Sequence, residues 1–190
     1  PALDAARANI AAWTAEIEGA GLDAIVINAS GCGTTVKDYG FMLREDAQWA
    51  GRASRVAGLA VDITELVDAL GFAASTPVPP LSVAYHSACS LQHGQNIHGL
   101  PKRLLQQAGF TVVEPRDGHL CCGSAGVYNI LQPDMADGLK SRKLDKLHAT
   151  GAAAVAAGNI GCITQLNAPD VPVRHTIQFL DWATGGAKPF

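Results

Sequence analysis

The chain has 190 residues, of which 48% are hydrophobic and 16% are charged, and its formal net charge is −3. This length and hydrophobic content predict a globular protein with one domain of ordinary size or two small ones. The acidic balance, with no cluster of more than a few Lys or Arg residues, excludes nucleic acid as a partner.

The sequence shows neither a membrane span nor a secretion signal. No apolar run approaches the roughly 20 residues that cross a bilayer, and no basic segment at the amino terminus precedes an apolar one. We therefore expect a cytoplasmic protein. The chain starts at Pro1, already in a helical pattern, so we expect it to be the carboxy-terminal piece of a longer protein.

The first 81 residues contain helical patterns on both sides of one strand. Apolar residues at helical spacing predict a helix over 3–19, and a short buried strand follows over 23–30. The pattern is helical again over 34–70, in two pieces broken near 44–46. The Pro-rich stretch 71–81 is predicted to be a loop.

The rest of the chain alternates strands with helices. Strands are predicted over 82–86, 110–115, 152–159 and 171–175. A helical segment begins near Cys89 and is clearest over 101–107, and further helices are predicted over 124–131, 133–150 and 176–183. This alternation predicts the α/β class, with a mostly parallel sheet and flanking helices.

All five cysteines follow predicted strands by a few residues: Cys32, Cys89, Cys121, Cys122 and Cys162. The loops that leave the carboxyl ends of parallel strands share one edge of the sheet, where ligands bind. We therefore expect thiols that are scattered in the sequence to gather at one edge.

Two segments of the chain resemble each other. Residues 21–34 and 151–164 align without gaps at an offset of 130, and in both a helical pattern precedes a strand and a Gly-Cys pair. The Gly-Cys pairs are Gly31-Cys32 and Gly161-Cys162. We interpret this as a duplication whose first copy is incomplete in this chain.

The cysteines could simply be small buried hydrophobic residues, and for Cys32 this alternative stays open. For the other four, their places in predicted glycine-bearing loops favour metal or cluster ligation. A disulfide between Cys121 and Cys122 would close a strained ring and need an oxidising compartment or a catalytic cycle.

The residues around the adjacent pair are suited to thiolate ligands. Gly123 and Gly126 would let the backbone approach a bulky inorganic group, and a helix starting near Ser124 would lower thiol pKa values. His86, His93 and His119 lie near the cysteines. Histidines in such places are usually exposed or hydrogen-bonded, with His86 the strongest exception because it ends a predicted strand.

The segments 85–95, 120–147 and 157–166 resemble the cysteine-rich CCG domain of glycolate oxidase iron–sulfur subunits. Related domains occur in heterodisulfide reductase, anaerobic glycerol-3-phosphate dehydrogenase and lactate-utilisation proteins. The resemblance implies that Cys89, Cys121, Cys122 and Cys162 ligate one centre. Many CCG domains have a further cysteine where this chain has Gln165, which argues against a five-thiolate cluster. Four thiolates suit a [4Fe–4S] cluster or a structural zinc ion.

The segment 28–40 resembles the end of a first CCG repeat. The resemblance therefore implies a division into the end of the first repeat (1–70), a linker (71–80) and the second CCG domain (81–190). Cys32 would be a ligand of a different cofactor site, whose other ligands lie before Pro1. We expect Cys32 to lie far from the other four sulfurs, and truncation can leave the metal sites of this piece empty.

The resemblance implies an electron-transfer subunit without catalysis of its own. A flavoprotein partner would oxidise a 2-hydroxy acid such as glycolate, and electrons would pass through this subunit toward a membrane quinone. The complex would be cytoplasmic or peripheral at the inner membrane. The alternatives are a zinc-bound or metal-free assembly domain that docks the flavin subunits, and a subunit of a lactate, glycerol-3-phosphate or heterodisulfide-type oxidoreductase.

Overall fold

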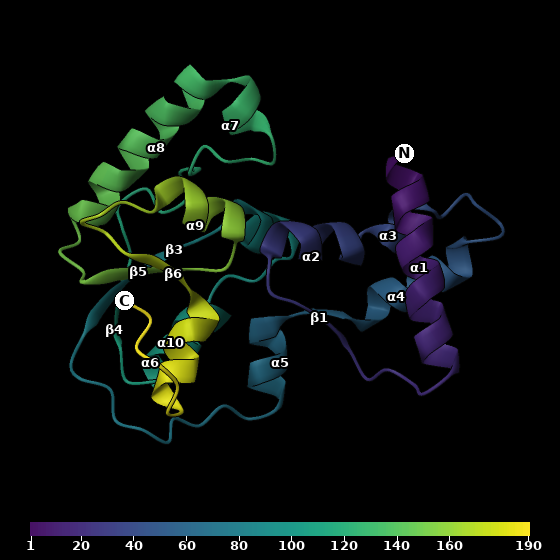
Figure 1. Ribbon diagram of the computed structural model, residues 1–190, viewed down its shortest axis with the longest axis horizontal. Coiled ribbons are helices and arrows are strands. Elements are labelled where there is room, and N and C mark those ends of the chain that lie inside the picture. Colours follow the sequence, from purple (N-terminus) through teal and green to yellow (C-terminus); the bar gives the residue numbers. More distant parts are fainter.

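The computed structural model describes residues 1–190 as an α/β protein with two sheets, each made of parallel strands and flanked by helices (Figure 1). This confirms the predicted fold class. The elements of the first half are α1 (Ala2–Glu18), β1 (Ile25–Ile27), α2 (Ser30–Lys37), α3 (Tyr39–Met42), α4 (Ala50–Leu59), β2 (Ala60–Asp62) and α5 (Ile63–Ala69).

The second half begins with β3 (Ser82–His86) and a short π-helical turn, η1 (Ser90–Gly94). The remaining elements are α6 (Leu100–Gln107), β4 (Thr111–Val113), α7 (Tyr128–Leu131), α8 (Pro133–His148), β5 (Ala154–Ala157), α9 (Ile160–Leu166), β6 (Val173–His175) and α10 (Thr176–Ala183). None of these helices is both long and apolar enough to cross a membrane.

The larger sheet has the strand order β4-β3-β5-β6, and every neighbouring pair is parallel. Its side chains alternate between two cores, as the period of two in a strand requires. Ala84 and Val155 face a core that also contains Cys122 and Cys162. On the opposite face, the core includes Val83, Tyr85, Ala154 and Ala156 together with side chains of α6 and α10.

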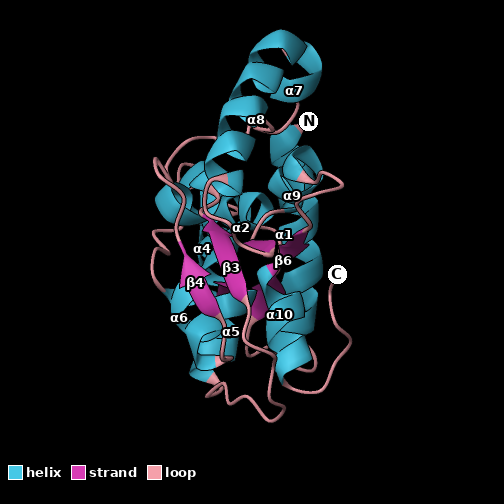
Figure 2. Ribbon diagram, turned by 90° about the vertical axis from the view of Figure 1, so that its left-hand side faces the viewer, coloured by secondary structure: helices cyan, strands magenta, loops and turns pink.

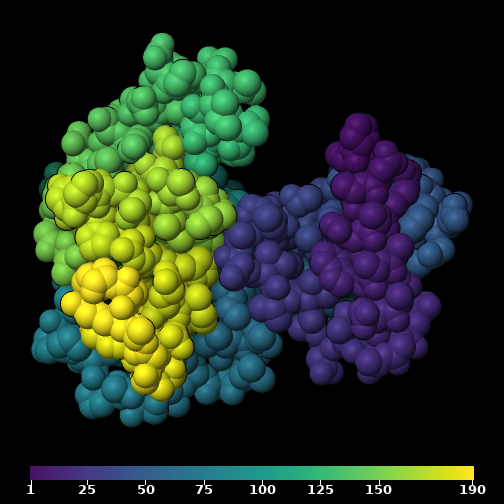
Figure 3. Space-filling view, viewed as in Figure 1, coloured from purple at the N-terminus to yellow at the C-terminus, as the bar shows by residue number.

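The smaller sheet pairs β1 with β2 and has a separate core, which includes Ile10, Val36 and Val56. Figure 1 shows this amino-terminal part, α1 to α4, beside the larger part, with α2 reaching across toward it, and Figure 3 shows a notch between α1 and the α7–α8 arm. Figure 2 shows the strands enclosed by helices, with α7 and the start of α8 projecting beyond them.

Strand β2 was missed by the sequence pattern, which is helical throughout 34–70. Three residues are too few to show a strand period, and they follow α4 directly. Pairing with β1 holds them extended, and Asp62 then caps α5 by accepting a hydrogen bond from the Thr64 N–H at 2.9 Å.

The helix predicted over 124–131 begins only at Tyr128, so that prediction was wrong at its start. Ala125 and Gly126 have φ values of 36° and 66°, which a right-handed helix cannot accommodate. Ser124 therefore opens a turn, so the helix start expected there is absent.

The structure repeats itself beyond the short sequence match. Helix α1 ends at residue 18 and α8 at 148, and α2 begins at 30 and α9 at 160, all at an offset of 130. The strand registers also correspond, because Ile25 pairs with Ala60 as Val155 pairs with Val173. The two halves therefore share a helix–strand–helix–strand unit, with α3 and α4 as an addition in the first.

Candidate metal centre

Four cysteines and one histidine lie at the carboxyl-terminal ends of the large sheet's strands. His86 ends β3 and Cys89 directly precedes η1. Cys121 and Cys122 lie in the loop between β4 and α7. Cys162 is the third residue of α9, so its placement in a loop was wrong, and the same holds for Cys32 in α2.

The closest contact in this group joins two buried thiols. The Sγ atoms of Cys122 and Cys162 are 3.1 Å apart, and each residue is 2% exposed. A ring nitrogen of His86 lies within 4.8 Å of both sulfurs. Residues 40 positions apart in the sequence thus meet at one point, as the topology of a parallel sheet allows.

Cys121 and Cys89 are not part of this compact trio and are less buried than its members. Cys121 is half-buried and Cys89 is exposed. Burial raises the pKa of Cys121, and the neighbouring Cys122 and Cys89 thiols raise it further. The Gly123 N–H donates a hydrogen bond to the Cys121 sulfur at 3.4 Å, which partly offsets this increase.

The two buried thiols shift each other's pKa values in opposite directions. A hydrogen bond from Cys162 lowers the pKa of Cys122 to about 4, with His86 and the Ser124 N–H acting in the same direction against burial. For the same reason, and because it is buried, Cys162 has a raised pKa. The Asn159 amide donates to the Cys162 sulfur at 3.6 Å, so backbone and side-chain N–H groups approach the thiols from several elements.

His86 is buried without a partner. It is 1% exposed, and neither ring nitrogen has a hydrogen bond within the protein. A buried imidazole usually satisfies at least one nitrogen, and burial lowers the pKa of this one. An unpartnered imidazole beside two buried thiols is the donor set of a metal centre, so the residues present fit a thiolate-bound metal.

Two glycines allow close packing around the cysteine loop. Gly123 has a φ of 89°, and a Cβ at this position would lie 2.5 Å from the carbonyl oxygen of Ala136 in α8. Gly161 similarly allows the Ser124 hydroxyl to approach, since an added Cβ would lie 2.7 Å from it. These glycines let the cysteine loop pack against α8 and α9.

Cys32 lies in the first turn of α2 and is exposed. It is not part of the trio of His86, Cys122 and Cys162. Helix α2 contacts η1 through a 2.7 Å hydrogen bond between the hydroxyls of Ser30 and Ser90. That Cys32 belongs to a separate site remains a prediction.

Sequence reasoning missed one charged residue of this region, Lys143 of α8. Its side chain is fully buried, and its ammonium donates to the Gly118 carbonyl at 2.8 Å. The signal was available, because residues 136, 143 and 147 form the buried face of the helix and the middle one is a lysine.

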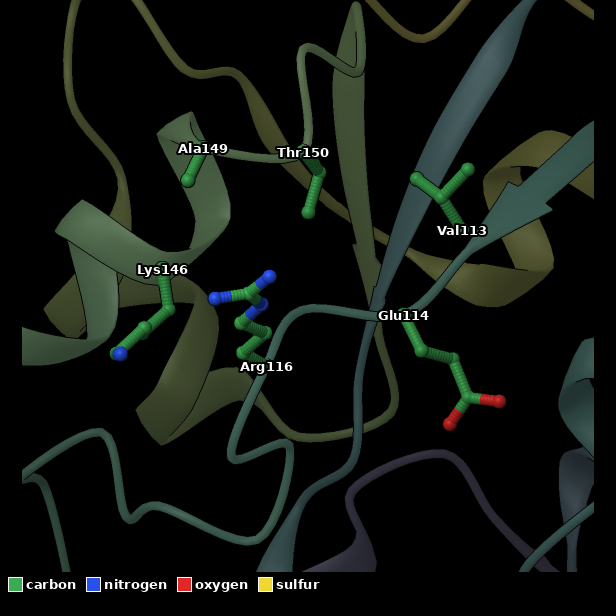
Figure 4. Close-up of a pocket in the computed structure, with 6 residues that line it drawn as sticks. All are labelled: Val113, Glu114, Arg116, Lys146, Ala149 and Thr150. Carbon is green, nitrogen blue, oxygen red and sulfur yellow. The ribbon is translucent and has the colours of Figure 1, made fainter.

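A separate surface cavity of about 480 Å³ lies between β4 and the end of α8. Figure 4 shows Arg116 and Lys146 on one side of it and Glu114 on the other. Lys146 pairs with Asp117 at 3.2 Å. No cysteine lines this cavity, so it is distinct from the thiol site.

Comparison with known proteins identifies the segment that carries these thiols. Residues 83–167 match the cysteine-rich domain family designated CCG. This segment is a CCG domain. The match includes Cys89, Cys121, Cys122 and Cys162 and confirms the family resemblance expected from the sequence.

The chain is similar to proteins named as glycolate oxidase iron–sulfur subunits and as lactate utilization protein A. It is 41% identical to the glycolate oxidase iron–sulfur subunit of Escherichia coli (strain K12), over 95% of this chain and 44% of that protein. Identity is 32% to the "Probable glycolate oxidase iron-sulfur subunit" of Bacillus subtilis (strain 168), over 85% and 36%. Lactate utilization protein A of Exiguobacterium sp. (strain ATCC BAA-1283 / AT1b) is 26% identical over 78% and 62%. The chain spans less than half the length of the two glycolate oxidase relatives.

Proposed function

We propose that this chain belongs to the iron–sulfur subunit of a 2-hydroxy-acid-oxidising complex. Cys89, Cys121, Cys122 and Cys162 would hold a [4Fe–4S] cluster, which supplies one-electron transfer when bound. The observation that carries the proposal is the meeting of Cys122 and Cys162, 3.1 Å apart, at the sheet edge of a CCG domain. The names of the relatives add glycolate as the first candidate substrate of the whole complex.

The residues of the chain suit this role in three ways. Burial of Cys122 and Cys162 keeps water away from the thiolates. The N–H groups of Gly123 and Ser124 and the Asn159 amide act on the sulfurs and would stabilise the negative charge of an all-thiolate site. The exposed Cys89 would bring the centre toward the surface, where an electron donor can approach.

The proposed path of electrons begins at a flavoprotein partner, which oxidises the hydroxy acid. Electrons then pass through this subunit toward a membrane quinone. The chain would contribute no substrate site of its own, and the complex would be cytoplasmic or peripheral at the inner membrane.

The test is substrate-driven reduction of the intact complex. Glycolate added without oxygen should produce the electron paramagnetic resonance signal of a reduced cluster, and lactate serves as the comparison substrate. Cys121→Ser should remove one component of that signal. A variant spectrum identical to that of the unaltered complex, with the subunit fully assembled, would contradict the proposal.

A zinc site in an assembly domain is the second candidate, and the compactness of the trio favours it. Two sulfurs bound to one tetrahedral zinc ion at 2.3 Å lie about 3.8 Å apart. The sulfurs of Cys122 and Cys162 are 3.1 Å apart, and a His86 nitrogen lies within 4.8 Å of both. This separation is closer to the spacing around one zinc ion than to the wider spacing of thiolates around a larger cluster. A colourless protein with one zinc ion per site would support this candidate.

A further inference from the structure

Lys143 is the charged side chain most completely removed from water in this protein. It has no exposed surface and is the largest of the fully buried side chains. An ammonium group has three N–H donors, and here one acceptor is identified, the Gly118 carbonyl at 2.8 Å. Burying such a cation is costly unless an opposite charge lies close by.

No carboxylate makes an ion pair with Lys143. The acidic residue nearest in sequence to its hydrogen-bond partner, Asp117, pairs instead with Lys146. Burial lowers the pKa of Lys143, and the Cys122, Cys162 and Cys121 thiols oppose this shift more than Asp117 does. Gly118 belongs to the loop that carries Cys121 and Cys122, so the ammonium is anchored directly to the cysteine loop.

His86 also faces this region, and the Lys143 charge acts on its ring. Lys143, His86, Cys122 and Cys162 are thus all buried, and the two thiols lie within 4.8 Å of a His86 nitrogen. The ammonium is attached to α8, while the thiols come from the cysteine loop and α9.

We propose that Lys143 is the built-in counter-charge of the thiolate centre: it raises the reduction potential of the bound cluster and tethers the cysteine loop through Gly118. This inference rests on the proposed function. Adding an electron to an all-thiolate cluster increases its negative charge, and a nearby buried cation favours that reduced state. Lys143 is thus a positioning residue, and its effect is read in the potential.

The test compares four variants of the intact protein, purified without oxygen. Lys143→Met removes the charge and the donor, Lys143→Gln removes only the charge, and Lys143→Arg keeps both. Lys146→Met is the matched control, because it removes a 38%-exposed cation that contacts the same loop from the same helix. Iron and sulfide content and the midpoint potential of the cluster are measured in each.

We expect the Met and Gln variants to lower the reduction equilibrium constant at least tenfold, which is about 59 mV for a one-electron couple. Arg should preserve the potential, and Lys146→Met should change it by much less. Unchanged potentials in fully loaded Met and Gln variants would overturn the inference. If the Met and Gln variants hold no cluster, a cluster in the Arg variant supports the inference. Absence of the cluster from all three variants contradicts the inference.

Failure of the proposed function would be visible separately, as zinc instead of iron and sulfide in the unaltered protein. Zinc affinity is then measured by competition with a chelator. At least tenfold weaker binding in the Met and Gln variants, but not in Lys146→Met, supports the counter-charge role in a zinc site. Equal affinities would overturn it there too.

Discussion

At the scale of single residues, the contact between Cys122 and Cys162 favours metal binding. Their sulfurs are 3.1 Å apart, and this contact lowers the pKa of Cys122 and raises that of Cys162. The lowered pKa of Cys122 favours the thiolate form that binds a metal. His86 lies beside them, and neither of its ring nitrogens has a hydrogen-bond partner.

Single cysteine substitutions should distinguish the metal site of the second half from the position of Cys32 in the first half. We expect Cys121→Ser to abolish metal binding by this chain, because a closed four-thiolate site tolerates no missing ligand. Cys32→Ser should leave the metal content unchanged. Metal analysis after anaerobic reconstitution checks this, and equal loss in both variants would make Cys32 a ligand of the same site.

The loop glycines allow a matched comparison of strain and contact. Gly123→Ala and Gly126→Ala both place a side chain at positive φ, which costs about 1–3 kcal/mol. Only Gly123→Ala also drives a Cβ to 2.5 Å from the Ala136 carbonyl oxygen, which adds an overpacking cost of about 1–3 kcal/mol. Urea unfolding should rank Gly123→Ala as clearly less stable, and equal losses would contradict the packing described for this loop.

At the scale of elements, the contact between α2 and η1 joins the two halves of the molecule. Thr34 donates to the Ser30 carbonyl at 2.9 Å and is also within 3.0 Å of the Ser90 carbonyl, and Gln95 donates to the Ser30 carbonyl at 2.9 Å. This junction places the helix of Cys32 next to the turn that follows Cys89.

Thr34→Val should weaken this junction by about 0.5–1.5 kcal/mol, because the isosteric side chain cannot donate. Thr35→Val is the control, since Thr35 donates only to Gly31 within its own helix, at 3.2 Å. Its effect should stay within about 0.5 kcal/mol. The free energy of unfolding in urea measures both, and indistinguishable values would argue against a stabilising junction.

The ion pair between α5 and α6 should add a pH-dependent contribution. Hydrogen bonds from Arg103 to Asp68, at 2.8 and 3.0 Å, lower the pKa of this carboxyl. Its stabilisation is therefore present above the unfolded pKa of about 3.9 and is lost as the pH falls through the lower folded value. The stability difference between the unaltered protein and Asp68→Asn should shrink from pH 7 to pH 3, and high salt should reduce it at pH 7. A constant difference would contradict this assignment.

Most elements could be predicted from the sequence, including the five-residue strand β3 with its observed bounds, but strand β2 and the turn at Ser124 could not. The span 176–183 was predicted as α10 appears, and α1 was predicted to within a residue at each end. Strand β2 exists because of its partner β1, and the turn at Ser124 depends on backbone angles that composition does not reveal. Lys143 escaped notice because a lone lysine in a helix is usually exposed.

At the scale of the whole molecule, the internal structural repeat relates the positions of two of the cysteines. Matching strand registers place Cys32 and Cys162 at the same position of equivalent helices. The short sequence match indicated that the two segments correspond, but only the strand registers show that β2 and β6 correspond as well. The proposed division at residues 71–80 remains a prediction.

The central claim is that four thiolates of the CCG domain hold one iron–sulfur cluster. The most direct test is iron, zinc and acid-labile sulfide analysis of the chain after anaerobic reconstitution, together with its absorption spectrum. The account predicts a brown protein that absorbs broadly near 400 nm, with about four iron and four sulfide per chain. A colourless protein that binds one zinc ion, or no metal, with all five thiols reduced would contradict it.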